Sequence, residues 1–346
     1  MTQYSVFSTR YLLLLAILAG CGGERAGGPA GSAKATGAGV QAQKRITVAL
    51  LPKRKGVPYF TSCAEGAQEA AKELGDVELI YDGPTDGSAT ASADMIDRWV
   101  QKKVDVIAVS PNNPDVLAAA MKKARDKGLH VISWDADARP ETREFFVNQA
   151  TAQNIGCALV DTMAKDIGGE GEVAILSATA AAANQNEWMK YMKERLAEKY
   201  SKVQLIDTKY PGEDQNEALK LAQGFISDRP SLKGIFGISS MAFPAAAKAV
   251  RDAGRSGKIM VTGLSTPNDM KEFVKDGTVK SVILWNTRDL GYLTVYAAHA
   301  LAKGELKAGD KTLQAGRLGE KTISGDNILL GDILVFTKEN IDKFDF

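Results

Sequence analysis

The feature that most constrains the fold is a regular alternation of apolar strand-like segments and amphipathic helix-like segments, which begins at residue 45. Each strand-like segment is a short apolar run, often β-branched, that ends at turn residues. Continuous apolar strands alternating with amphipathic helices are typical of a parallel sheet covered by helices on both faces. The strands expected in the first half of the chain are Ile46–Leu51, Val77–Tyr81, Val104–Ser110, Val131–Asp135 and Phe145–Asn148.

The same alternation restarts near residue 150, so the sequence predicts two doubly wound α/β lobes. A chain of 346 residues is long enough for two such domains. No Pro/Gly-rich linker separates the two halves, which favours a tight hinge. We expect the first lobe to comprise residues 44–149 and 287–325, and the second lobe to comprise residues 150–286 and 326–346.

The N-terminal segment has the order of a bacterial export signal. Arg10 precedes the short apolar run Tyr11–Leu18 and two small residues before Cys21. This order predicts a signal peptide over residues 1–21, because the run is far shorter than the roughly 20 residues that span a bilayer. The four residues that end at Cys21 resemble a lipobox, in which the cysteine becomes the lipid-modified first residue; an ordinary signal peptide with an incidental cysteine is the alternative. Residues 22–43 have the composition of a flexible tether.

Composition argues against several classes of function. Lys and Arg number 43 and Asp and Glu 42, so no basic patch for nucleic acid is implied. With two His, three Cys and no CxxC pair, no His/Cys metal cluster can be assembled. Neither a Gly-x-Ser-x-Gly elbow nor a phosphate-binding loop is present. We therefore expect a binding protein that needs no cofactor, rather than an enzyme.

Polar and aromatic residues gather where the predicted strands end, which is where open parallel sheets bind ligands. Charged and amide side chains suit the hydroxyls of a sugar, and aromatic rings suit its C–H faces. Structural explanations stay open, since a Lys-Arg-Lys run is typical of a solvated loop, an Asp or Asn can cap a helix, and a Trp can be core. The candidates are Lys53, Phe60, Asp135, Asn184, Gln185, Trp285, Asn286 and Asp289.

These residues belong to a longer pattern, because residues 45–346 resemble the type I periplasmic binding proteins of ABC importers. The resemblance is strongest to the group of autoinducer-2-binding and rhamnose-binding proteins. It implies a ligand held between two lobes, a permease partner in the membrane, a periplasmic or cell-surface location and a monomer. The stretches that carry it are Tyr59–Ser62, Gly66–Ala70, Tyr81–Thr85, Ser133–Asp135, Asn184–Asn186, Pro244–Ala247, Ser265–Asn268 and Asn340–Phe346.

The resemblance points to two ligands. The autoinducer-2 group implies contacts from Lys53, Asp135, Asn184, Gln185, Pro244 and Ala246. Asn184 departs from that group, which has an acid there, and so loses a charge-assisted acceptor. The rhamnose group is similar at other stretches: Asn184–Asn186 after Ala174–Thr179, Trp285–Asn286 with Asp289–Tyr292, and Ala315–Arg317. We slightly favour a rhamnose-type deoxysugar, with autoinducer-2 as the alternative.

Other classes of function are less consistent with the sequence. A sugar-responsive transcription regulator shares the core fold but needs an N-terminal helix-turn-helix, where this chain has the predicted signal peptide and tether. An enzyme that acts on a sugar would need paired acids or a metal set at the cleft. Coupling to a chemoreceptor is compatible with transport, and the sequence does not separate the two.

Overall fold

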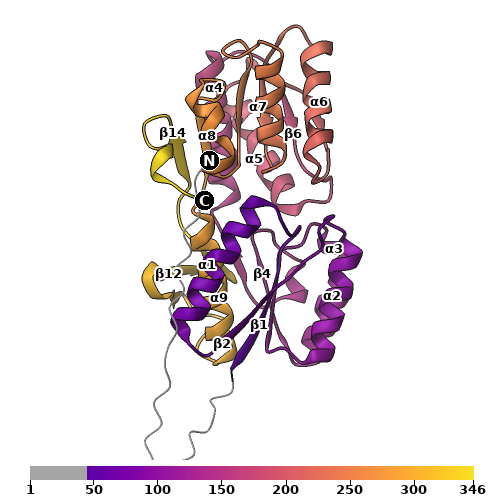
Figure 1. Cartoon of the computed structure of the whole chain (residues 1–346), viewed down its shortest axis with the longest axis vertical. Helices are drawn as coiled ribbons and strands as arrows, with labels where there is room; N and C mark the ends of the chain where they lie inside the picture. The colour runs from indigo at the N-terminus through magenta and orange to yellow at the C-terminus, as the bar shows by residue number, and fades with distance from the viewer. Residues whose placement is uncertain (1–44) are drawn as a thin grey trace, which may run out of the picture. The chain divides into compact units, whose positions relative to one another are not determined.

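A computed structural model describes residues 45–346, which form two α/β lobes, each built around its own main sheet (Figure 1). The predictions for Cys21, for the signal peptide and for the tether lie outside the described residues. Within the described range the expected architecture of parallel sheets with packed helices is confirmed.

The first lobe contains an eight-stranded sheet. Its strands are β1 (Ile46–Leu51), β2 (Val77–Tyr81), β3 (Val106–Val109), β4 (His130–Trp134), β5 (Phe146–Asn148), β11 (Thr312–Gln314), β12 (Glu320–Ser324) and β13 (Asn327–Leu329). They lie in the order β11-β12-β13-β5-β4-β3-β1-β2, and every pairing from β13 to β2 is parallel. The strand order reverses between β1 and β3, so this sheet has the switch point at which doubly wound folds bind ligands.

The second lobe repeats this order. Its strands are β6 (Gly171–Leu176), β7 (Val203–Lys209), β8 (Leu232–Gly237), β9 (Met260–Gly263), β10 (Ser281–Leu284) and β14 (Leu334–Thr337). The parallel order β7-β6-β8-β9 is extended by a bridge between Leu264 and Ile283 that sets β10 beside β9, and β14 pairs antiparallel with β10. A second switch point therefore lies between β6 and β8.

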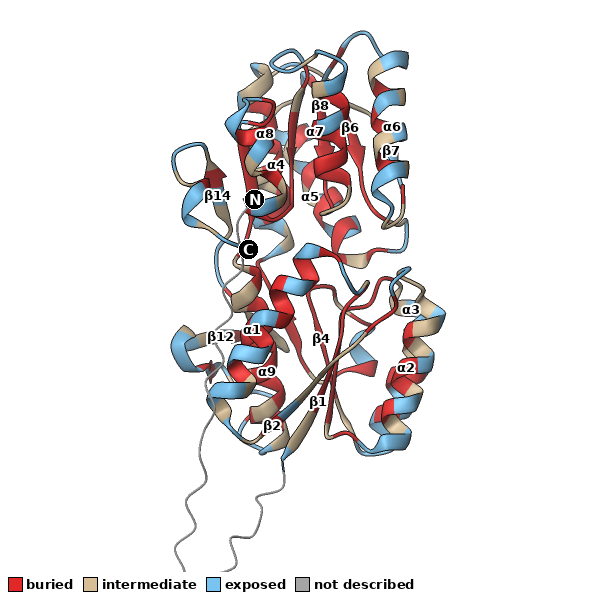
Figure 2. Cartoon of the chain, viewed as in Figure 1, coloured by how far each residue is buried: buried red, intermediate tan, exposed pale blue. Residues whose placement is uncertain are grey.

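Helices cover both faces of each sheet (Figure 1). In the first lobe, α1 (Pro58–Leu74) packs on α9 (Thr287–Ala302), and α2 (Ala89–Lys102) packs on α3 (Pro114–Asp126). In the second, α4 (Ala152–Ile167) packs on α5 (Ala183–Lys199), and α6 (Gln215–Asp228) packs on α7 (Ala242–Asp252), with α8 (Pro267–Lys275) next to α7. Figure 2 shows the buried residues concentrated in the strands and on the helix faces turned toward them.

Glycines allow α1 and α9 to approach closely. A Cβ added at Gly66 would lie 1.8 Å from the Arg288 backbone oxygen, and one added at Gly291 would lie 1.8 Å from the Cys63 backbone oxygen. No side chain fits at such distances, so these two positions need glycine. Because α9 follows a strand of the second lobe, this contact fixes the return of the chain to the first lobe.

The described chain passes between the lobes at three places, namely β5 to α4, β10 to α9 and β13 to β14. The boundary expected at residue 325 is wrong. β13 pairs in parallel with β5, and the Phe146 backbone N–H donates to the Asp326 carbonyl at 2.9 Å. This pairing keeps the segment through Leu329 in the first lobe, so the last crossing comes after it.

Candidate ligand-binding site

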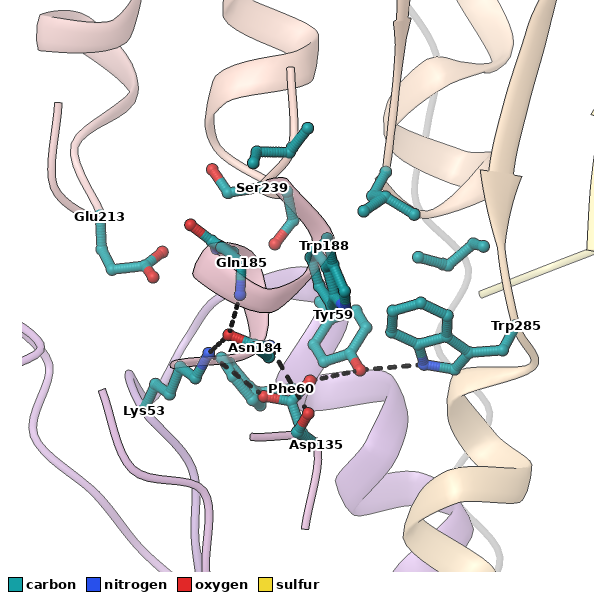
Figure 3. Close-up of a pocket in the computed structure, with 14 residues that line it drawn as sticks. Lys53, Tyr59, Phe60, Asp135, Asn184, Gln185, Trp188, Glu213, Ser239 and Trp285 are labelled. Atoms are coloured by element: carbon teal, nitrogen blue, oxygen red, sulfur yellow. Dashed lines mark hydrogen bonds and ion pairs between the residues drawn. The ribbon is translucent and has the colours of Figure 1, made fainter. Parts of the chain in front are cut away.

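A small cavity of about 40 Å³ lies at the carboxyl ends of strands from both sheets (Figure 3). Its lining combines charged, amide, hydroxyl, aromatic and aliphatic side chains. The lining residues are Lys53, Tyr59, Phe60, Asp135, Asn184, Gln185, Trp188, Glu213, Ile238, Ser239, Ser240, Leu264, Leu284 and Trp285. This is the position that the two switch points predict for a ligand site.

Lys53 and Asp135 form the charged centre of the first-lobe wall. Lys53 follows β1 and is only 4% exposed, although it begins a Lys-Arg-Lys run. Its Nζ lies 3.5 Å from Asp135 Oδ2. Asp135 also accepts hydrogen bonds from the Tyr59 hydroxyl at 2.7 Å and from Ser110 Oγ at 2.8 Å. Its backbone φ of 62° is a left-handed conformation that non-glycine residues rarely adopt, so the carboxylate is held in place by its surroundings.

Two amides in the first turn of α5 form the opposite wall. Lys53 Nζ donates to Asn184 Oδ1 at 3.1 Å, which is a direct bond between the lobes. Gln185 Oε1 accepts from Ser177 Oγ at 2.6 Å and from the Ala178 backbone N–H at 2.7 Å. Both bonds go to the oxygen, and no described residue accepts from the amide nitrogen of Gln185. That nitrogen is therefore free to donate to a ligand.

Aromatic rings close the cavity on one side. Tyr59, Phe60 and Trp285 pack edge to face, and Trp188 lies 6.2 Å from Trp285 between ring centroids. Trp285 Nε1 donates to the Tyr59 hydroxyl at 3.0 Å. Burial, reinforced by the nearby charge of Asp135, raises the pKa of Tyr59 well above its ordinary value. The phenol therefore stays protonated and keeps donating to Asp135.

Glu213 brings a second carboxylate to the cavity from the loop between β7 and α6 (Figure 3). Burial raises the pKa of its carboxyl, Asp135 adds to the rise, and Lys53 and Arg54 oppose it. Glu213 was not among the predicted site residues, because the Tyr-Pro-Gly stretch before it is typical of a simple turn. The signal that could have found it is its place in the loop between β7 and α6, at the carboxyl end of a strand.

Six of the predicted site residues meet in this cavity. They are Lys53, Phe60, Asp135, Asn184, Gln185 and Trp285. Neither Asp135 nor Asn184 stands at a helix N-cap, although Asn184 Oδ1 accepts from the Gln185 backbone N–H at 2.9 Å in the first turn of α5. Besides Glu213, the lining residues that the sequence did not predict are Tyr59, Trp188, Ile238, Ser239, Ser240, Leu264 and Leu284.

Four predicted site residues do not line the cavity. Pro244 and Ala246 are buried within α7. Asn286 caps α9, accepting from the Asp289 backbone N–H at 3.2 Å. The Asp289 carboxylate pairs with Arg317 at 2.6 Å. Packing within α7 thus explains the small apolar residues Pro244 and Ala246. Capping of α9 explains Asn286, and the ion pair with Arg317 explains Asp289.

Between residues 45 and 346 no group of three or more His, Cys, Asp or Glu is arranged to hold a metal ion. In the same range no helix combines the length and the apolar character needed to cross a bilayer.

Two doubly wound lobes with a polar and aromatic cavity at their strand ends define a bilobal solute-binding protein. Residues 48–306 match the family described as periplasmic binding protein domain. The chain therefore belongs to the type I periplasmic binding proteins, a family of sugar-binding components that work with ABC permeases. The predicted class, a binding protein rather than an enzyme, is confirmed by this membership.

Three similar proteins illustrate the range of the family. The D-allose-binding periplasmic protein of Escherichia coli K12 is 24% identical, over 70% of this chain and 80% of its own length. A solute-binding protein of Clostridium phytofermentas with bound L-rhamnose is 30% identical, with a TM-score of 0.80 over 86% of this chain and 98% of that one. LsrB of Clostridium saccharobutylicum in complex with AI-2 is 25% identical, with a TM-score of 0.82 over 87% and 100%.

Proposed function

We propose that this chain is a lipid-anchored, monomeric solute-binding protein of an ABC importer, and that it binds a rhamnose-type deoxysugar in the cavity. Lys53, Asp135, Asn184 and Gln185 would hold the hydroxyls, while the aromatic rings would pack on the C–H face of the sugar. Cys21 would carry the lipid, which keeps the protein in the periplasm or at the cell surface.

The observation that carries this proposal is the composition of the cavity wall. Polar groups from both lobes face one another across the cavity, as a ring with hydroxyls on several edges requires. Ile238, Leu264 and Leu284 add an aliphatic wall. A deoxysugar has a methyl group where an ordinary hexose has a hydroxymethyl group, and a methyl group gains from burial against such a wall.

Autoinducer-2 is the second candidate, because the set that the resemblance implies for it largely meets in one cavity. Lys53, Asp135 and Gln185 are all present at the lining. Asn184 distinguishes the two candidates. As an amide it accepts from Lys53 through Oδ1, donates one N–H to the Asp135 carbonyl at 3.5 Å and has a second N–H for a ligand, whereas an ionised acid could only accept. A ligand that needs an acceptor charge at this point would bind less tightly.

Calorimetric titration of the purified full chain with L-rhamnose and, separately, with autoinducer-2 tests the proposal. We expect tight binding of L-rhamnose and loss of most of that affinity in Asp135→Ala. Tight binding of autoinducer-2 alone would reassign the protein to signal uptake. Silence with both ligands would refute the ligand assignment, and unchanged affinity in Asp135→Ala would remove that residue from the site.

A further inference from the structure

The carboxylate of Glu213 is unusual among the polar groups of the cavity, because it makes no hydrogen bond or ion pair with any residue that the structure describes. The loop that carries it is fixed by its backbone. Arg54 of the first lobe donates from Nη1 to the Glu213 carbonyl and from Nε to the Thr85 carbonyl at 2.7 Å. The Arg54 guanidinium is thus engaged with backbone oxygens, and the carboxylate is directed to the space beside Gln185 and Lys53 (Figure 3).

The charges at the lining do not balance. Among the lining residues, Lys53 is the one Lys, Arg or His, and Asp135 and Glu213 are the two Asp or Glu residues. Lys53 and Asp135 pair with each other at 3.5 Å and are both buried. The charge of Glu213 is left without a partner at the wall, in surroundings whose burial disfavours it. A partly buried carboxylate without donors is costly, so such a group calls for donors from a ligand.

We propose that Glu213 is a ligand-contacting specificity residue, which accepts a hydrogen bond from a hydroxyl of a neutral polyol and excludes sugars that carry a negative charge. This inference rests on the proposed function, because it assumes that the cavity binds a sugar. A carboxylate accepts but cannot donate. A neutral ring therefore gains a charge-assisted bond there, whereas a uronate or a sugar phosphate would place a second negative charge in the same confined space.

The test compares the purified full-length wild type with Glu213→Gln and with the matched control Glu217→Gln. Glu217 lies four residues further on in α6, where it pairs with Lys220 at 3.4 Å and does not line the cavity. Calorimetry would use the neutral sugars L-rhamnose, D-ribose and D-allose, autoinducer-2, and the anions D-glucuronate and D-ribose 5-phosphate. We expect wild type to bind at least one of the neutral ligands and neither anion. Glu213→Gln should weaken the bound ligand about tenfold, because a charge-assisted bond becomes a neutral one, and Glu217→Gln should match wild type.

A melting experiment without ligand separates recognition from a structural role. Because the carboxylate has no partner to lose, Glu213→Gln should melt at or above the temperature of wild type. A lower midpoint together with weaker binding would mean that the residue supports the fold, and would overturn the inference. Binding of an anion as tight as that of a neutral sugar would also overturn it.

The failure of this inference can be told apart from failure of the proposed function. If wild type binds a neutral sugar and Glu213→Gln binds it within twofold, the inference fails and the sugar-binding function stands. If wild type binds none of the neutral ligands, both fail together.

Discussion

Replacing Lys53 by methionine tests whether the buried ammonium holds the site together. Methionine keeps the approximate length of the side chain but removes its charge and its donors. Lys53 is only 4% exposed and contacts both Asp135 Oδ2 at 3.5 Å and Asn184 Oδ1 at 3.1 Å. The substitution therefore removes one ion pair and one bond between the lobes.

The expected loss of stability depends on the hydrogen bonds that Asp135 keeps when Lys53 is replaced. Removing one partner of a buried ion pair costs about 3–5 kcal/mol. Asp135 keeps two hydroxyl donors, Tyr59 and Ser110, at 2.7 and 2.8 Å. We therefore expect a loss nearer 2 kcal/mol, which corresponds to a fall in melting temperature of about 3 °C for a protein of this size. Ligand affinity should fall tenfold or more, because Lys53 is the only cationic hydrogen-bond donor among the described residues that line the cavity.

Lys55→Met provides the matched control from the same Lys-Arg-Lys run. Lys55 pairs with Asp82 at 2.9 Å, but the two side chains are 44% and 51% exposed. Exposed pairs contribute little to stability, so this variant should melt within about 1 °C of wild type and bind its sugar normally. Differential scanning calorimetry and ligand titration would measure both effects. Equal behaviour of the two variants would refute the assignment of Lys53 to the site.

Two further predictions concern packing and closure. Gly66→Ala should destabilise the protein by about 1–3 kcal/mol in denaturant unfolding, because the added Cβ would lie 1.8 Å from a backbone oxygen of α9. The control Gly224→Ala lies in a helix with open space around it and should be neutral or stabilising. An equal loss of unfolding free energy in both variants would contradict this packing argument. Arg54→Gln removes a donor that joins the lobes and should speed ligand dissociation several-fold in stopped-flow tryptophan fluorescence. The control Arg125→Gln loses a similar bond within the first lobe and should leave the ligand dissociation rate unchanged. If the dissociation rate is unchanged in both variants, the contact between Arg54 and Glu213 does not retain the ligand.

The sequence predicted the two-lobed α/β fold because the alternation of apolar strands and amphipathic helices is a local property of each segment. It could not predict which distant segments pair. β13 is three residues long, and its apolar residues are compatible with either lobe; only the backbone bonds to β5 place it in the first lobe. The boundary at residue 325 was wrong for this reason.

The same limit applies to the site. Lys53 and Asp135 were predictable because polar residues that directly follow buried strands of a doubly wound sheet face the ligand crevice. Asn286 and Asp289 follow β10 in the same way, but they cap α9 and pair with Arg317. A capping residue and a ligand contact require the same short polar side chain after a strand. The chain alone therefore does not separate them, and Glu213 was overlooked for the opposite reason, because its loop resembled an ordinary turn.

The selectivity of the cavity for hydroxyl-rich ligands follows from how its polar groups are paired. Lys53, Asp135 and Asn184 satisfy one another across the lobes. A ligand that enters between them must replace the bond between Lys53 and Asn184. Otherwise the buried ammonium keeps only Asp135, and the Asn184 oxygen keeps only the Gln185 backbone N–H. Adjacent hydroxyls, which donate and accept at once, can replace both ends of that bond. An apolar ligand of the same size can replace neither end, so it loses that bond without compensation. The penalty on wrong ligands, rather than the attraction of the right one, would then set the specificity of this site.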